Sequence, residues 1–225
     1  MLWAQGASSF LTAALSDRVT ITGARASSHY GEHVTTELAT GLAAEERVVI
    51  AGGAFGIEGA AHRGVLTAAG QAIAVLATGV DRRYPAAHSE LLDRIGDTGL
   101  LVSELPPGAA PSRERFIARS RLMVALSGVV VIPEASMQSG AMRVVLAAQN
   151  LGRGVGAVPG PVTSVASSGP NELIKQSLAV LVTQPRDVIA LLDADRSPTR
   201  AAGRPEVGHH LDTKRVNLDG PGHSL

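Results

Sequence analysis

Four glycines in twelve residues mark the stretch AGGAFGIEGAAH, residues 51–62, as a loop able to hold a ligand. It follows an apolar run that indicates a buried strand, and it leads into a helix that begins near Ile57. Gly52 and Gly53 let the backbone turn with its N–H groups uncovered, and Gly56 stands just before the helix. Because the positive end of the helix dipole points at the loop, a phosphate fits there. The spacing G-G-x-x-G is not the dinucleotide fingerprint G-x-G-x-x-G, so a turn made only for packing remains the alternative.

Two further loops that follow strands offer places for an anion. In TGARASSHYG, residues 22–31, Gly23 opens the turn and Arg25 stands where its guanidinium can fork onto a phosphate. The alternative for Arg25 is an exposed arginine at the edge of the sheet. In IPEASMQSG, Ser139 and Gly140 lie at the expected start of a helix, which is another potential anion site.

Positive charge is densest in SRERFIARSR, residues 112–121, which has four arginines and one glutamate in ten positions. Arg115, Arg119 and Arg121 share this expected helix with Phe116, one of only three phenylalanines in the chain. Arginines for phosphates and an aromatic ring for base stacking are what binding of single-stranded nucleic acid requires. The alternative is a solvated helix face with the phenylalanine in the core.

Composition limits the classes of protein that fit. The chain has 225 residues, enough for one α/β domain, and its formal net charge is zero, so any basic patch is local. It has no cysteine, which excludes disulfides and thiolate chemistry, and the spacing of its histidines and carboxylates is not that of metal ligands. We therefore expect no metal and no cofactor. No apolar run has the roughly 20 residues of a membrane span, and the N-terminus is a poor signal peptide, so a cytoplasmic protein is expected.

Short β-rich runs alternate with Ala/Leu-rich amphipathic stretches along most of the chain. The expected strands are 18–22, 47–51, 71–77, 100–104, 128–134, 154–158 and 179–183. The expected helices are 30–46, 57–70, 87–97, 112–127, 138–152, 171–176 and 186–192. Strands that are apolar on both faces and separated by helices indicate a parallel sheet covered on both sides. The predicted fold is α/β, a doubly wound, mostly parallel sheet in a Rossmann-like three-layer sandwich.

Three regions are predicted along the chain. Residues 1–17 are expected to form an N-terminal helical extension, and residues 18–192 the Rossmann-like core. Residues 193–225 lose periodicity and are expected to form a polar, flexible tail. In a doubly wound sheet ligands sit beyond the carboxyl ends of the strands, and the loops at those ends are the richest here in Gly, Pro and Ser. One shared site is therefore expected.

Taken in order, these loops resemble the DNA-processing protein A family (DprA, also called Smf). The matching series is TGARASSHYG, then AGGAFGIEGAAHRGVLTAAGQAIAVLATGVDRRYPAAH, then LVSELPPG, RFIARSRLMVALS, EASMQSGAM, AVPG and NELIKQ. It covers about residues 18–192, and its middle block, ending in G-x-D-x-x-Y-P at 79–85, is the most specific part. Members have a Rossmann-like core that binds single-stranded DNA and loads a RecA-type recombinase during natural transformation.

The resemblance implies roles for residues that the spacing had already singled out. Arg25 and the Arg115–Arg121 segment would contact DNA phosphates, and Phe116 would stack on a base. Lys175, in the NELIKQ segment, would join the phosphate-binding set. The pocket floor would be Gly52, Gly53, Gly56, Ser139 and Gly140. A homodimer is expected from the family alone.

Three departures from the family pattern fall in the candidate loops. Ala24 stands where the family usually has Ser, Glu58 where it has Asp, and Ser120 where it has Asn. Ala24 and Ser120 remove side-chain hydrogen-bonding capacity. Many members also carry a helical domain before the core and a winged-helix domain after it, so this chain resembles the bare core.

The expected function is a single-stranded DNA-binding recombination mediator with no chemistry of its own. One alternative is a sensor of a free nucleotide or nucleotide-derived signal. Another is an enzyme similar to the nucleoside-phosphate phosphoribohydrolases, which have P-G-G-x-G-T-x-x-E where this chain has PEASMQSGAM. In that comparison Glu134 is the only substitute for the catalytic carboxylate. His62, on the helix after the glycine loop, is interpreted as a hydrogen-bonded packing residue.

Overall fold

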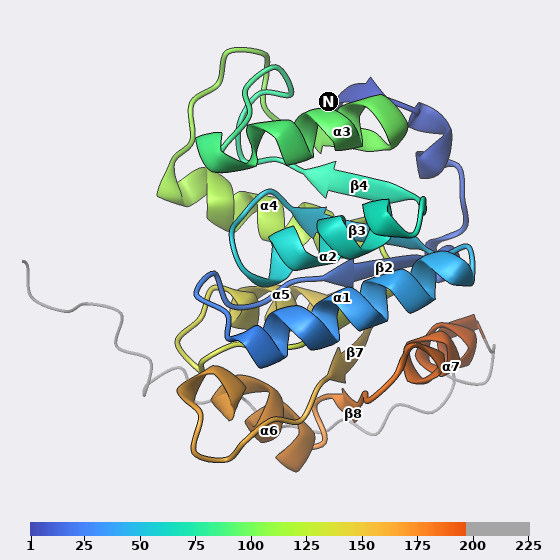
Figure 1. Cartoon of the computed structure of the whole chain (residues 1–225), viewed down its shortest axis with the longest axis vertical. Helices are drawn as coiled ribbons and strands as arrows, with labels where there is room; N and C mark the ends of the chain where they lie inside the picture. The colour runs from blue at the N-terminus through green and yellow to red at the C-terminus, as the bar shows by residue number, and fades with distance from the viewer. Residues whose placement is uncertain (197–225) are drawn as a thin grey trace, which may run out of the picture.

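One sheet organises the chain. The computed structural model describes residues 1–196, and the strands of that part form a single eight-stranded sheet in the order β1-β5-β4-β3-β2-β6-β7-β8 (Figure 1). Every pairing is parallel except that of β1 with β5. The strands are β1 (Trp3–Gly6), β2 (Arg18–Ile21), β3 (Val48–Gly52), β4 (Ala72–Val75), β5 (Leu100–Ser103), β6 (Val129–Ile132), β7 (Gly154–Ala157) and β8 (Val180–Leu181). The predicted doubly wound, mostly parallel sheet is confirmed.

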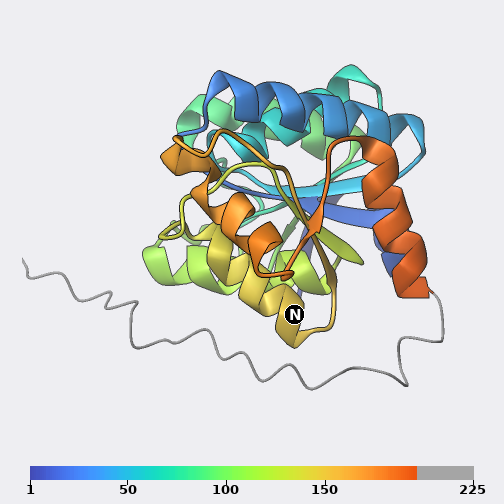
Figure 2. The same ribbon diagram turned by 90° about the horizontal axis from the view of Figure 1, so that it is seen from below.

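Helices cover both faces of the sheet. They are α1 (His29–Ala44), α2 (Ile57–Thr67), α3 (Ser89–Thr98), α4 (Arg113–Ala125), α5 (Ala141–Asn150), α6 (Ser168–Lys175) and α7 (Pro185–Arg196). Buried apolar residues form separate cores on the two faces of the sheet. Helices α1, α2 and α7 pack on one face, and α4, α5 and α6 pack on the other (Figure 2). Among residues 1–196, none of the helices combines the length and apolar character that crossing a membrane requires.

The strands are buried on both faces because their side chains alternate between the two helical layers. In β3, Val49 and Ala51 pack into the core beneath α1 and α2, whereas Val48 and Ile50 pack into the core beneath α4. A sheet of this kind needs continuous apolar strands, and that continuity is the pattern that the sequence displays. Two helices begin at serine caps, since the hydroxyls of Ser28 and Ser112 accept hydrogen bonds from backbone N–H groups in the first turns of α1 and α4.

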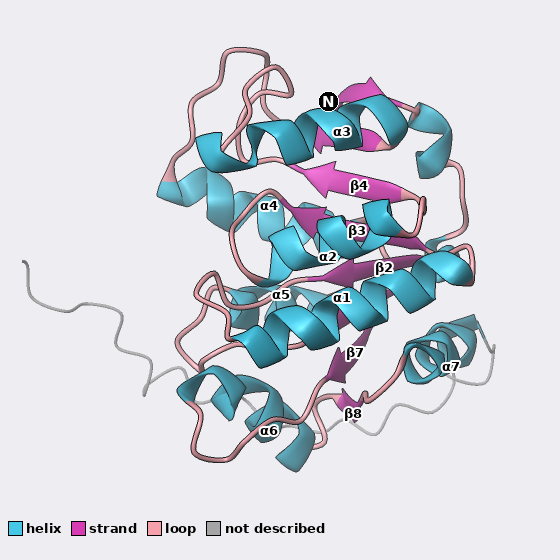
Figure 3. Cartoon of the chain, in the orientation of Figure 1, coloured by secondary structure: helices cyan, strands magenta, loops and turns pink. Residues whose placement is uncertain are grey.

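The sheet has a topological switch point between β2 and β6. From β2 the chain moves outward through β3, β4 and β5, and it then returns to place β6 on the other side of β2. The loops that leave β2 and β6 therefore diverge to opposite layers and open a crevice at the carboxyl ends of the strands. Figure 3 shows loops gathered at the end of the sheet to which the strand arrows point.

The N-terminal segment differs from the predicted helical extension. Short 3₁₀ helices form at Ser8–Leu11 and Leu15–Asp17, but Trp3–Gly6 forms β1, paired antiparallel with β5. All four residues of β1 are exposed, so no apolar pattern could reveal this strand. Backbone hydrogen bonds to the edge of β5 hold it instead.

At the other end, the boundary of the predicted tail also differs. The sequence predicts that the polar tail begins at residue 193, whereas α7 continues to Arg196. The remainder of that predicted tail, residues 197–225, lies outside the described residues.

Candidate functional site

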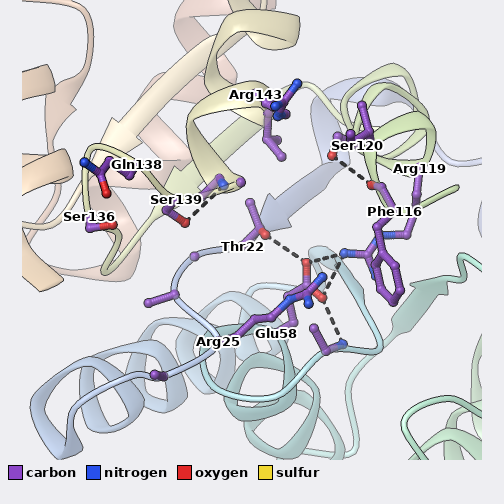
Figure 4. Close-up of a pocket in the computed structure, with 18 of the residues that line it drawn as sticks. Thr22, Arg25, Glu58, Phe116, Arg119, Ser120, Ser136, Gln138, Ser139 and Arg143 are labelled. Carbon is purple, nitrogen blue, oxygen red and sulfur yellow. Dashed lines mark hydrogen bonds and ion pairs between the residues drawn. The ribbon is translucent and has the colours of Figure 1, made fainter. Parts of the chain in front are cut away.

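A cavity of about 710 Å³ opens at the switch point (Figure 4). Its walls come from the loop after β2, the loop between β3 and α2, one side of α4, and the loop that joins β6 to α5. These segments are far apart in the sequence and meet only because their strands are neighbours or nearly so. The structure therefore has a cavity at the carboxyl ends of the strands, where the sequence predicts a shared site.

A buried ion pair forms part of the wall of this cavity. The Arg119 Nη2 atom of α4 donates to both carboxylate oxygens of Glu58 on α2, at 2.8 and 3.1 Å. Thr22 Oγ1 and the backbone N–H of Ala54 also donate to Glu58, at 2.9 and 3.0 Å. Only 5% of the Glu58 side chain and 8% of the Arg119 side chain are exposed. Both oxygens of Glu58 are thus already engaged.

The same partners determine the charge state of Glu58. Burial by itself would raise the pKa of this carboxyl group, but the charge of Arg119 and the hydrogen bonds from Ala54, Thr22 and Arg119 outweigh it. The pKa consequently lies below its ordinary value, and Glu58 stays ionised. A carboxylate held in this way is a structural anchor for Arg119 and a poor general acid or base.

The glycine loop packs around this ion pair. A Cβ atom on Gly52 would lie 2.0 Å from Arg119 Nη1 and 2.4 Å from Glu58 Oε2, so only glycine leaves room for the pair. Gly56 has φ of 70°, and a Cβ there would lie 2.3 Å from the Ala24 carbonyl oxygen. Gly52, Gly53 and Gly56 are buried and do not line the cavity. Their contact with phosphate stays a prediction, and the geometry favours the packing alternative.

Two histidines hold the carbonyl groups of the same loop. His62 Nε2 lies 3.0 Å from the Gly52 carbonyl oxygen, and His88 Nδ1 lies 3.0 Å from that of Gly53. Because a carbonyl oxygen only accepts, both ring nitrogens donate. Burial lowers the pKa of His62 to about 4, despite the nearby carboxylate of Glu58. His62 is therefore the neutral, hydrogen-bonded packing residue that the sequence indicated.

An aromatic ring at the cavity lies close to two cationic side chains. Phe116 is half-buried, and the guanidinium carbons of Arg25 and Arg119 lie 4.7 and 5.3 Å from its ring centroid. These distances are in the range of cation–π attraction. The structure thus brings together three residues that the sequence had selected from two separate segments, and all three line the cavity.

Unpaired positive charge gathers around the same opening. Arg25, Arg113 and Arg143 line the cavity and are exposed, and none has a carboxylate within 4.0 Å among residues 1–196. Arg25 and Arg143 are labelled in Figure 4. Arg113 and Arg143 were not selected from the sequence. Helical phase could have identified Arg113, because Arg113, Phe116 and Ser120 follow the spacing i, i+3, i+7 on one face of α4.

Three predicted cationic residues lie elsewhere. Arg115 donates to the backbone carbonyl of Ala110, and Arg121 forms a two-pronged ion pair with Glu104, at 2.7 and 2.8 Å. Lys175 is at the end of α6, and its Nζ atom lies 3.8 Å from Glu172. None of the three lines the cavity. Arg115 and Arg121 were selected for charge density, which does not distinguish the faces of a helix.

The start of α5 forms the opposite wall. Ser139 and Gly140 line the cavity as expected, together with Ser136 and Gln138. Gly140 is exposed, and a Cβ built on it would meet nothing within 4 Å, so its backbone is open to the cavity. The positive end of a helix dipole there suits an anion. From the first loop Gly23 lines the cavity too, and its backbone packs against the Glu134 carbonyl.

Glu134 serves the fold instead of the cavity. It is buried, and its carboxylate accepts hydrogen bonds from the Ser28 backbone N–H and hydroxyl, at 2.9 and 2.6 Å. A Cβ atom on Gly31 would lie 2.1 Å from one of its oxygens, so the carboxylate is packed against the first turn of α1. It does not line the cavity. The one carboxylate considered as a catalytic substitute is thus occupied in holding Ser28, the N-cap residue of α1.

Fold and site together define a Rossmann-like α/β protein with an open, cationic cavity at its topological switch point. The chain belongs to the family of DNA recombination-mediator protein A, whose family model matches residues 1–193. The resemblance of its loops to that family is confirmed.

Relatives agree with this assignment. DprA of Mycobacterium tuberculosis is 49% identical over 169 residues, which are 75% of this chain and 43% of that protein. DprA of Streptococcus pneumoniae is 39% identical over 173 residues, which are 77% of this chain and 61% of that protein. The chain therefore spans about half the length of the curated relatives it matches.

Solved structures of the family superimpose closely. The X-ray structure of Streptococcus pneumoniae DprA matches with a TM-score of 0.79 and 37% identity, over 84% of this chain and 65% of that one. Helicobacter pylori DprA matches with a TM-score of 0.78 and 30% identity, over 86% of this chain and 87% of that one. The latter structure is described as giving insights into a single-stranded DNA binding mode.

The buried histidine predicts how stability changes with acid. The pKa of His62 is about 4 in the folded protein against 6.5 ordinarily, so the unfolded chain binds the extra proton first. As the pH falls from 6.5 to 4, the free energy of unfolding should drop by about 3 kcal/mol from this group alone. Urea unfolding measured across this range should show that slope. The variant His62→Gln keeps an N–H donor for the Gly52 carbonyl and should lose most of this pH dependence of the free energy of unfolding. An unchanged slope would contradict the lowered pKa of His62.

The ion pair predicts a large cost when one partner is removed. Arg119→Met leaves Glu58 buried without its cation, and the free energy of unfolding should fall by about 3–5 kcal/mol. The double variant Glu58→Gln/Arg119→Met removes the uncompensated charge, keeps an oxygen to accept from the Ala54 N–H and offers an amide N–H to the Thr22 hydroxyl, so it should recover part of the loss. Urea unfolding at neutral pH measures both. Equal losses in the single and double variants would show that the pair is not coupled.

Proposed function

We propose that this chain binds single-stranded DNA and acts as a recombination mediator, with the cavity between β2 and β6 as the principal binding site. The observation that carries the proposal is the ring of Phe116, which lies against two guanidinium groups at a cavity lined by three arginines that have no carboxylate partner among residues 1–196. The net charge of the chain is zero, so this positive charge is a local feature. An aromatic ring beside phosphate-binding cations is the combination that single strands require.

The proposed mechanism of binding is electrostatic positioning followed by stacking. Arg25, Arg113 and Arg143 neutralise phosphates and release counterions, and the positive end of the α5 helix dipole favours a further phosphate oxygen. A base then stacks on the Phe116 ring. Phosphate contacts carry no base information, and every base has a π-face, so binding tolerates sequence.

Binding without chemistry is favoured by the state of the carboxylates. Among the described residues that line the cavity, Glu58 is the one carboxylate, and Arg119, Thr22 and Ala54 occupy it. Glu134 caps α1. Cleavage of a glycosidic bond normally needs a free carboxyl group beside the sugar, so a phosphoribohydrolase activity has little support here.

The relatives support the wider role. Helicobacter pylori DprA is described with a single-stranded DNA binding mode and aligns over most of both chains. We extend that property to this protein, together with loading of a RecA-type recombinase in DNA uptake and a cytoplasmic location. Because the chain matches only part of its longer relatives, these whole-protein roles belong to the proposal.

A homodimer is part of the same proposal, with β8 as its contact. β8 is the last strand of the sheet, and Val180 and Leu181 are both exposed, so within residues 1–196 one of its backbone edges has no partner strand. Exposed apolar edge strands are natural templates for pairing between chains. Pairing of β8 with its equivalent would join two sheets and place two cavities on one assembly.

The DNA proposal predicts distinct effects for arginines on and off the cavity. Arg25→Ala, Arg113→Ala and Arg143→Ala should each weaken binding of labelled oligo-dT and lower the slope of log affinity against log salt by about 1. Fluorescence anisotropy at several salt concentrations measures both quantities. Arg119 is unsuitable as a variant here because its loss destabilises the fold.

Arg121→Ala is the matched control, since Arg121 is an arginine of α4 that pairs with Glu104 away from the cavity. Its affinity and salt slope should equal those of the wild type, and a loss as large as that of Arg25→Ala would place the DNA elsewhere. No binding at low salt, with nucleotide found in the purified protein by mass spectrometry, would favour the nucleotide-sensor alternative.

The dimer proposal predicts that a charge on the edge strand separates the chains. Leu181→Asp should sediment as a monomer in analytical ultracentrifugation and keep the thermal stability of the wild type. Val162→Asp, at a fully accessible loop position, is the control and should remain dimeric. A dimeric Leu181→Asp variant, or a monomeric wild type, would exclude β8 as the contact.

A further inference from the structure

Two exposed aromatic rings lie outside the cavity. Phe55, in the loop between β3 and α2, is 46% exposed, and Tyr84, in the loop between β4 and α3, is 44% exposed. Neither lines the cavity. Aromatic residues make up only 3% of the chain, with three Phe and two Tyr, so the collection of such residues at one end of the sheet calls for an explanation.

Contacts connect these rings to Phe116. The ring centroids of Tyr84 and Phe116 lie 5.9 Å apart with planes at 59°. The loops that carry Tyr84 and Phe55 touch, because a Cβ atom on Gly53 would lie 3.0 Å from the Tyr84 carbonyl oxygen. Phe55 follows Gly53 by two residues. Helix α4 and two loops that follow neighbouring strands therefore carry Phe116, Tyr84 and Phe55 at the same end of the sheet.

Polar contacts fix the loop that carries Tyr84. Asp81 accepts the Gly108 N–H with both carboxylate oxygens at 2.9 Å, and Arg83 Nε donates to Asp93 at 2.7 Å. Thr78 Oγ1 donates to the Arg82 carbonyl at 2.7 Å. These contacts hold the segment before Tyr84, and a backbone hydrogen bond from the His88 N–H to the Pro85 carbonyl, at 2.9 Å, holds the turn after it, so the exposed ring belongs to an ordered surface.

The ring of Phe55 is supported in a similar way. It meets the ring of His88 edge-on, with centroids 4.7 Å apart, and His88 in turn holds the Gly53 carbonyl at 3.0 Å. His88 is buried, so one side of Phe55 rests on a fixed partner while the remainder faces solvent. A ring that is held in place and exposed loses little entropy when a ligand stacks on it.

We propose that Tyr84 and Phe55 form a second base-stacking position next to Phe116, so that the site holds consecutive nucleotides of one strand instead of a single nucleotide. This inference rests on the proposed function. A base is favoured as the occupant because the neighbouring groups are the cations Arg25 and Arg119 at Phe116, which suit the phosphates between stacked bases. A protein partner would meet the same rings, and the experiment below separates the two.

The experiment compares oligonucleotides of increasing length with a mononucleotide. Fluorescence anisotropy is measured with oligo-dT of about 4 to 16 nucleotides, the span of sites on single-strand binders, and dTMP is used as a competitor. Tyr84→Leu and Phe55→Leu should each weaken binding of the longer oligonucleotides by about tenfold and leave competition by dTMP unchanged. Tyr84→Phe, which keeps the ring, should bind as the wild type does.

A stacking signal and a matched control complete the test. A 2-aminopurine base within the oligonucleotide should be quenched by the wild type and by Tyr84→Phe, and less by Tyr84→Leu. Leu151→Ala removes an exposed apolar side chain at the far end of α5 and should change nothing. Thermal unfolding of each variant is recorded, and all four should melt with the wild type because the changed side chains are exposed.

The outcomes distinguish this inference from the proposed function. If Tyr84→Leu and Phe55→Leu bind long oligonucleotides as tightly as the wild type while Arg25→Ala is weakened, the second position is refuted and the DNA site stands. Such a result would assign the aromatic edge to a protein partner. If the wild type binds no oligonucleotide of any length at low salt, the proposed function fails and this inference fails with it.

Discussion

The ion pair between Glu58 and Arg119 is the contact on which the site depends. Glu58 lies on α2, which covers one face of the sheet, and Arg119 lies on α4, which covers the other. The pair therefore joins the two helical layers beyond the ends of the strands, where no strand lies between them. Because Phe116 is one turn before Arg119 on α4, fixing Arg119 also fixes the ring against the loop of Arg25. Buried ion pairs seldom add much net stability, and we infer that this one is valuable for positioning.

The glycines and histidines around the pair follow from the same constraint. Two charged side chains brought against the β3 backbone leave no space for a Cβ atom at Gly52, and the loop carbonyls displaced from the sheet need donors. His62 and His88 supply those donors. Gly52 is thus explained by the charges packed above it, whereas Gly53 and Gly56 are explained by the close approach of neighbouring loop backbone.

The fold could be predicted almost completely from sequence, and the site only in part. The core strands and the helices were identified because apolar continuity and helical periodicity are local signals, whereas β1 was missed because all its side chains are exposed and its partner is β5, far along the chain. Arg25, Phe116 and Arg119 were found because loops after parallel strands converge. Arg121 does not line the cavity with them, since its position depends on helix phase and its pairing with Glu104 on a neighbouring loop. Arg143 was missed because it is the one charge in an apolar helix and resembles a solvated position.

The groups at the cavity that have no partner within residues 1–196 determine which class of ligand the cavity can bind. The fold uses its nearby carboxylates internally, Glu58 with Arg119 and Glu134 with Ser28. The groups left for a ligand are exposed guanidiniums, backbone at the start of α5, and the faces of aromatic rings. Such groups attract phosphate and accept flat bases. A polymer that alternates anionic phosphates with bases matches this set along its whole length, whereas a single small anion would use only the cations. The distribution of unpaired groups therefore argues for a strand as the ligand on grounds independent of the relatives.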